Sequence, residues 1–131
     1  MGAIGGYLYL SGKDAVRARQ MYELNDYTAC GRFCEQSAEK SLKAFIEKNG
    51  GISDRPLMKI HKPRRLYERC CELGLEEADA LFALQLSVFS EYYYDTNYPG
   101  ADYFELTEQQ AKEAIHVMER VNNSVIRALN R

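Results

Sequence analysis

The three prolines of this chain, at positions 56, 63 and 99, stand at the ends of segments whose apolar residues recur at helical spacing. Proline disfavours helix at the residue before it and is tolerated only in the first turn of a helix. Strand-like alternation is scarce after residue 10. We therefore expect an all-α fold, with residues 1–10 as a loosely ordered lead-in.

Residues 30–46 carry the most regular helical pattern. One face is apolar or small: Cys30, Phe33, Cys34, Ser37, Ala38, Ser41, Leu42, Phe45 and Ile46. Charged residues fill the other side: Arg32, Glu35, Glu39, Lys40, Lys43 and Glu47. Glu39 and Lys43 have the spacing of an i,i+4 ion pair, although these polar residues are also suited to contacts across a dimer. We expect this helix to end at residues 49–51 with a residue in the left-handed conformation.

Capping signals place the other helices. One helix should begin near Ser11, with Asp14 completing a capping box, and end near Asn25. A short helix should run from Pro63 to Gly74, after a loop over residues 52–62. Two long helices should follow, over residues 76–94 and from Thr107 onward. The short connections favour an up-down-up-down four-helix bundle with an extra short helix, as a single domain over residues 1–131.

The helix expected over residues 76–94 is apolar on more than one side. Its inner face should contain Ala78, Leu81, Phe82, Gln85, Val88, Phe89 and Tyr92. Leu84 and Leu86 fall outside that stripe, which indicates a self-association surface. The four tyrosines within residues 90–100 suit the mouth of a bundle or of a dimer cleft, because a phenol has an apolar body and a polar tip.

Composition narrows the protein class. The net charge is −2, so any contact with a polyanion requires a local basic patch. No apolar run is long enough to cross a membrane, and the first residues lack the basic region of a secretory signal. Cys30, Cys34, Cys70 and Cys71 form no secreted disulfide framework, and we interpret them as buried thiols and not as zinc ligands. A cytoplasmic protein without metal or cofactor is the prediction.

Three stretches together resemble the HEPN domain family. The first contains Ala29, Phe33, Gln36-Ser37-Ala38-Glu39-Lys40 and Leu42-Lys43-Ala44. The second is His61-Lys62-Pro63, a partial match to the family's His-Asp-Leu. The third is Tyr93 or Tyr94 followed by Asn97-Tyr98-Pro99. The resemblance spans residues 12–130. It implies a helical bundle, a homodimer, nucleotide or RNA binding, and pairing with a separate minimal nucleotidyltransferase in a toxin–antitoxin-like system.

Some branches of that family are metal-independent ribonucleases, with an arginine and a histidine four to six residues apart at a dimer cleft. In this chain Asn97 stands where the arginine is expected, and Asp102, Tyr103 and Phe104 stand where the histidine is expected. His116 has no arginine at the required upstream positions. A similar spacing occurs only in another loop, between Arg55 and His61, where a structural role for His61 is the main alternative.

The region of Arg55 and His61 is also locally basic: it contains Arg55, Lys59, Lys62, Arg64, Arg65 and Arg69. Arg64 and Arg65 in a first helical turn oppose the helix dipole, and a bound phosphate would reconcile them; contacts with acidic neighbours are the alternative. The leading hypothesis is a non-catalytic nucleotide- or partner-binding module. Its phosphate-site candidates are His61, Lys62, Arg64, Arg65, Tyr93, Tyr94, Asn97 and Tyr98. The alternatives are a ribonuclease using Arg55 and His61, and a structural homodimer without ligand.

Overall fold

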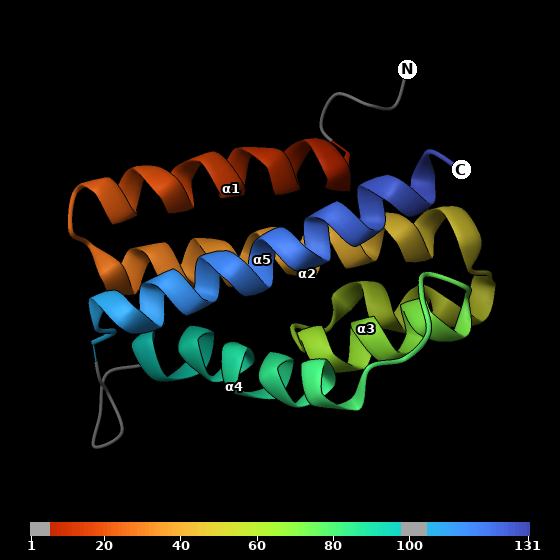
Figure 1. The fold of residues 1–131 in the computed structure, drawn as a ribbon. Helices are drawn as coiled ribbons and strands as arrows, with labels where there is room; N and C mark the ends of the chain where they lie inside the picture. Colours follow the sequence, from red (N-terminus) through yellow and green to blue (C-terminus); the bar gives the residue numbers. More distant parts are fainter. Residues whose placement is uncertain (1–5, 98–104) are drawn as a thin grey trace.

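The computed structural model describes residues 6–97 and 105–131, and the side chains of residues 6–89 and 105–131. Its elements are α1 (Tyr7–Glu23), α2 (Tyr27–Asn49), the 3-10 helix η1 (Ile52–Lys59), α3 (Pro63–Glu72), α4 (Ala80–Asn97) and α5 (Glu108–Leu129). The four long helices alternate in direction along the chain (Figure 1). The predicted up-down-up-down bundle with an extra short helix is confirmed, and η1 is an addition within the expected loop.

Helix α2 is the centre of the bundle. It contacts α1, α3, α4, α5 and η1 (Figure 1). Because neighbours surround it, its polar side is buried as well: Glu35, Glu39 and Lys43 are each at most 5% exposed. The charged side of the predicted helix is therefore part of the interior at these three positions. The predicted Glu39–Lys43 pair is confirmed, with 2.9 Å between Nζ and Oε1.

Helix α1 begins at Tyr7, so the expected lead-in is wrong for residues 7–10. Ser11 does not cap a helix; its hydroxyl is buried and lies 2.7 Å from Ser41 Oγ while donating to the Ser37 carbonyl at 2.8 Å. A cap would require Ser11 to stand at a helix end, whereas its packing against α2 places it one turn inside. The helix ends as expected before Asn25, which adopts a positive φ of 62°.

A buried polar network joins α1, α2 and α5. Ser41 donates to Asn122 Oδ1 at 2.6 Å, and Asn122 Nδ2 donates to Ser37 Oγ at 2.9 Å. Together with the Ser11 contacts, each of these side chains has a hydrogen-bond partner on another helix. A satisfied buried network of this kind favours one helix register over its alternatives, because sliding a helix would leave polar groups unpaired.

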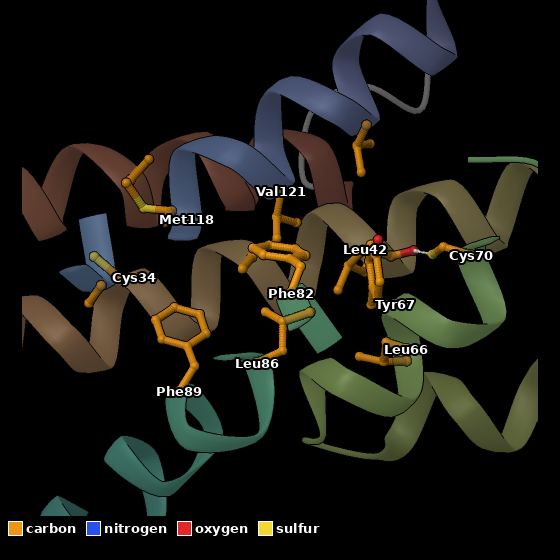
Figure 2. Close-up of a cluster of buried hydrophobic side chains, with 14 of the residues drawn as sticks. Cys34, Leu42, Leu66, Tyr67, Cys70, Phe82, Leu86, Phe89, Met118 and Val121 are labelled. Carbon is orange, nitrogen blue, oxygen red and sulfur yellow. Dashed lines mark hydrogen bonds between the residues drawn. The ribbon is translucent and has the colours of Figure 1, made fainter. Parts of the chain in front are cut away.

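Helix α4 is rotated relative to the prediction: Phe82 and Phe89 are buried as expected, whereas Leu86, which was expected outside the inner face, is buried as well. Phe82, Ala83, Leu86 and Phe89 are buried, and Figure 2 shows Phe82, Leu86 and Phe89 pointing into a core with Leu42, Met118 and Val121. Leu81 is 78% exposed and Val88 is 50% exposed, so the predicted inner face is wrong at both positions. The cause is tertiary: α4 packs on α2 and α3 and touches α5 at few positions. Leu84 is exposed, and the side chain of Tyr92 lies outside the described residues.

The remaining boundaries follow local chemistry. Asp79 accepts a hydrogen bond from the Phe82 amide at 3.0 Å, so α4 begins at Ala80 and not at residue 76. Pro63 occupies the first turn of α3, as predicted, and Gly74, with φ +98°, follows its end. The predicted capping box of Thr107 and Gln110 at the start of α5 is confirmed.

The four cysteines are free thiols. Cys30, Cys34 and Cys70 are buried and Cys71 is half-buried, in agreement with the interpretation as core residues. Cys70 donates to the Leu42 carbonyl at 3.4 Å, the contact drawn as a dashed line in Figure 2. Within residues 6–97 and 105–131, no helix combines the length and the apolar character needed to cross a membrane.

Candidate functional site

The connection from α2 to α3 is held by one buried carboxylate. Asp54, on η1, accepts from the Gly51 amide at 3.0 Å and from Arg69 Nε and Nη2 at 2.7 and 3.2 Å. The Arg69 hydrogen bond, followed by that of the Gly51 amide, holds the pKa of Asp54 below its usual value. This pair ties η1 to α3 and so fixes the segment that leads to His61.

Gly50 permits the close approach of Asp54 to the end of α2. A Cβ at Gly50 would lie 2.5 Å from Asp54 Oδ2 and 2.8 Å from the Ile46 carbonyl oxygen. Its φ is −93°, and Gly51 has φ −136°, so neither glycine is left-handed. The expectation of a left-handed helix end at residues 49–51 is wrong: the glycine is required for space and not for its backbone angle.

His61 is anchored to the interior of the bundle. Its Nδ1 lies 2.7 Å from Glu39 Oε1, and the same oxygen accepts from Lys43 Nζ at 2.9 Å. The Glu39 side chain is 7% exposed, whereas that of His61 is 52% exposed. An ionised Glu39 beside Lys43 can only accept, so Nδ1 carries the hydrogen of this bond. A buried carboxylate therefore sets the orientation of an exposed imidazole ring.

A small pocket opens beside His61. Its volume is about 240 Å³, and it is lined by Gln36, Glu39, Lys40 and His61. The Lys40 ammonium is paired with the buried Asp14 of α1, which also accepts from Arg17 at 3.2 Å. Lys40 donates to anions, and His61 does so through Nε2 in its imidazolium form, because Nδ1 is bonded to Glu39; buried carboxylates on α1 and α2 thus hold both groups at one pocket.

The residues of the predicted basic cluster fall into two groups, those whose side chains pair with a neighbour among the described residues and those whose side chains do not. Arg69 is bound to Asp54 and Glu72, and Arg64 contacts Glu68 at 3.4 Å and Ser87 at 3.1 Å. Lys62 and Arg65 are exposed, and within the part of the chain that the structure describes they make no hydrogen bond or ion pair through their side chains. The contacts with acidic neighbours account for Arg64 and Arg69 but not for these two residues.

Arg55 and His61 are not brought into one pocket. Arg55 lines a cavity of about 440 Å³ between α2 and η1, together with Tyr7, Gly51, Asp54 and Met58 among others, and His61 is not part of its lining. The spacing of the two residues in the sequence therefore does not translate into a shared site.

The aromatic candidates lie largely outside the described residues. Tyr93, Tyr94 and Asn97 belong to α4 by their backbone, but their side chains are not described, and Tyr98 lies outside the described residues altogether. His116 lines a groove of about 550 Å³ between α4 and α5, with Phe89 and Arg120 among its neighbours. Arg120 forms an ion pair there with Asp79, with 2.9 Å between Nη2 and Oδ2.

Sequence reasoning missed the burial of Glu35 and the pairing of Asp14 with Lys40. Glu35, Glu39 and Lys43 share the i, i+4, i+8 spacing that places them on one helix face. That spacing is available from the sequence, but the burial of the face is not, because it depends on which helices surround α2. Among the described residues, no group of three metal-ligating side chains lies close enough together to hold an ion.

Comparison with known proteins gives one match. The family model described as HEPN domain matches residues 9–129, nearly the whole chain. Searches of the curated proteins and of the solved structures gave no significant match.

Proposed function

Because this chain belongs to the HEPN domain family, we propose that it is a nucleotide- or RNA-binding module that does not cleave its ligand. The main support for this proposal is the group of exposed cations at the start of α3. Lys62 and Arg65 have no partner among the described residues, and no side chain caps the helix at Lys62. Backbone N–H groups at a helix start, flanked by uncommitted cations, favour a phosphate.

Two observations favour binding over cleavage. Asn97 stands where the ribonuclease branches of the family carry an arginine, and Arg55 and His61 line different pockets. The ribonuclease alternative predicts metal-independent RNA cleavage that His61→Ala abolishes. Cleavage by the wild type, lost in that variant, would replace the binding proposal.

The binding proposal is tested by fluorescence anisotropy with a labelled single-stranded RNA and a labelled adenine nucleotide. The double variant Lys62→Ala/Arg65→Ala should weaken RNA binding by at least about tenfold. It should also reduce the salt dependence by about one unit of slope for each RNA phosphate that the variant no longer neutralises. The matched control is Lys112→Ala/Arg127→Ala, which removes the same charge from α5. Equal weakening in both double variants, or no binding by the wild type, would refute the proposal.

We further propose that the chain acts as a homodimer. Leu81, Leu84 and Val88 form an exposed apolar strip on α4 next to the groove between α4 and α5. Light scattering should give twice the chain mass, and Leu84→Glu should reduce it to that of a monomer. A homodimer that binds neither RNA nor nucleotide would favour the purely structural alternative.

The four free thiols suit the cytoplasm as the compartment of this protein. Family membership suggests a separate minimal nucleotidyltransferase as its protein partner, in a toxin–antitoxin-like pair. Co-expression with such an enzyme tests this: the two chains should co-purify in a fixed ratio. A chain that elutes alone under those conditions would remove the partner from the proposal.

A further inference from the structure

We propose that the pocket of Gln36, Glu39, Lys40 and His61 binds a single phosphate group, and that a proton held on the buried Glu35 gives this pocket its positive charge. The inference rests on the proposed function and deepens it, since it assigns the phosphate of the ligand to particular side chains. It also gives a role to Glu35, the most unusual polar residue of the interior.

Glu35 is fully buried on α2, one turn before Glu39. In the part of the chain that the structure describes, neither of its carboxylate oxygens receives a hydrogen bond. An ionised carboxylate without donors is strongly disfavoured in a protein interior. A neutral carboxylic acid instead has a hydrogen to donate, and the neighbouring Glu39 carboxylate is an acceptor. Burial raises the pKa of Glu35 to about 10, and the charge of Glu39 acts in the same direction.

The proton on Glu35 decides the charge of the site. The charged and titratable groups that surround the site come from α1 (Asp14, Arg17), from α2 (Glu35, Glu39, Lys40, Lys43) and from the loop before α3 (His61). With Glu35 neutral and His61 left out of the count, the carboxylates of Asp14 and Glu39 face the cations of Arg17, Lys40 and Lys43, which leaves one net positive charge. An ionised Glu35 would cancel that charge and make the site unattractive to an anion.

The geometry offers donors of the right kind. Asp14 holds the ammonium group of Lys40, whose side chain is 29% exposed, and Glu39 holds the half-exposed His61 side chain. Gln36 adds an amide at the same pocket. The volume of about 240 Å³ is below the range of about 300–1,000 Å³ typical of pockets for drug-sized ligands. It therefore fits a phosphate group, with the rest of a nucleotide lying outside the pocket.

Binding is measured with inorganic phosphate, AMP and adenosine on the full chain, by calorimetry and by NMR of the two histidine rings. Phosphate and AMP should bind and adenosine should not. In the wild type, phosphate should shift the ring resonances of His61 and leave those of His116, which lines the separate groove between α4 and α5, unchanged. This readout requires no variant and therefore does not depend on how any variant folds.

Lys40→Gln should weaken phosphate binding by at least about tenfold. Lys48→Gln, an exposed lysine on the same helix, is the control and should bind within about twofold of the wild type. Equal weakening in the two variants, or a His61 ring that phosphate does not shift, would overturn the proposed site.

The variant Glu35→Gln tests whether Glu35 carries a proton in the folded state. The folded state holds this proton between the unfolded carboxyl pKa of about 4.3 and the folded pKa of about 10, so the stability of the wild type should fall as pH rises through that window. Glutamine has no proton to lose, so the melting temperature of the variant should exceed that of the wild type by a margin that widens from about pH 6 to pH 9. It should also retain phosphate binding within about twofold. A variant that is less stable than the wild type at every pH, or that no longer binds phosphate, would overturn the role of Glu35.

The two proposals fail differently. RNA binding that requires Lys62 and Arg65 but is indifferent to Lys40→Gln would remove this pocket and leave the proposed function in place. Binding of inorganic phosphate at His61, without binding of AMP or RNA, would leave the pocket and remove the proposed function.

Discussion

Two neighbouring glycines with unlike surroundings, Gly50 and Gly51, offer a direct test of the packing around Asp54. A Cβ at Gly50 meets Asp54 Oδ2 at 2.5 Å and the Ile46 carbonyl oxygen at 2.8 Å, both inside the 3.0 Å that real Cβ atoms essentially never cross. A Cβ at Gly51 meets nothing within 4 Å. Both residues have negative φ values that alanine adopts without strain, so alanine at each position tests space alone.

The two substitutions have one effect on the free energy of unfolding in common, and Gly50→Ala has a second effect of its own. Each restricts the unfolded chain, which stabilises the fold by about 0.4–1 kcal/mol. Only Gly50→Ala inserts a methyl group into occupied space, which costs about 1–3 kcal/mol for an overpacked site. The shared term cancels in the comparison, so Gly50→Ala should be less stable than Gly51→Ala by about 1–3 kcal/mol. For a chain of this length that corresponds to about 4–12 °C in melting temperature.

The assay is urea unfolding followed by circular dichroism at a helical wavelength, with both variants and the wild type measured side by side. An Asp54→Ala background is the control: the gap between the two glycine variants should shrink there, because the side chain in the way is gone. Equal midpoints for the two alanine variants, or a gap that persists unchanged in that background, would refute the assignment of Gly50 to the space beside Asp54.

Three further predictions concern the core, a helix cap and the acid response. Phe89→Ala should lower the free energy of unfolding by about 3–5 kcal/mol, whereas Leu84→Ala on the exposed side of α4 should change it by less than about 0.5 kcal/mol; urea unfolding of monomeric samples separates them. Thr107→Ala should cost about 1 kcal/mol in the same assay because the capping box is removed, and Thr107→Ser should restore most of it. Arg69 lowers the pKa of Asp54 in the folded state, so the stability that Asp54 contributes is present above the unfolded carboxyl pKa of about 3.9 and is lost as pH falls through the folded pKa. Asp54→Asn should therefore flatten the loss of stability on acidification. An unchanged acid profile would contradict this.

The sequence predicted the helices better than their rotations. The stripe of residues 30–46 identified the buried face of α2, because a period of 3.6 residues depends on local spacing alone. The face of α4 was predicted wrongly at Leu81 and Leu86, since several faces of that helix are apolar and the choice among them is made by α2 and α3. Only tertiary packing decides between equally apolar faces.

In the candidate site, too, local sequence predicted some features and tertiary packing decided the others. His61 stood out in the sequence as a loop histidine before a proline, and it does line a pocket. Arg55 stood out by its spacing from His61, but spacing in a loop does not determine direction, and the two residues line separate cavities. The burial of Glu35 was not predictable, because a glutamate on a helix is usually solvated and only the crowding around α2 removes it from water.

The unequal packing around α2 has a consequence for how the domain opens. Helices α1 and α5 share with α2 both a large interface and the network of Ser11, Ser37, Ser41 and Asn122, whereas α4 touches α5 at few positions. The domain therefore consists of a strongly coupled three-helix unit and an α3–α4 hairpin laid against it. In hydrogen exchange, the amides of residues 82–89 should exchange through partial opening of that hairpin, before those in the middle of α2, which should exchange only on global unfolding.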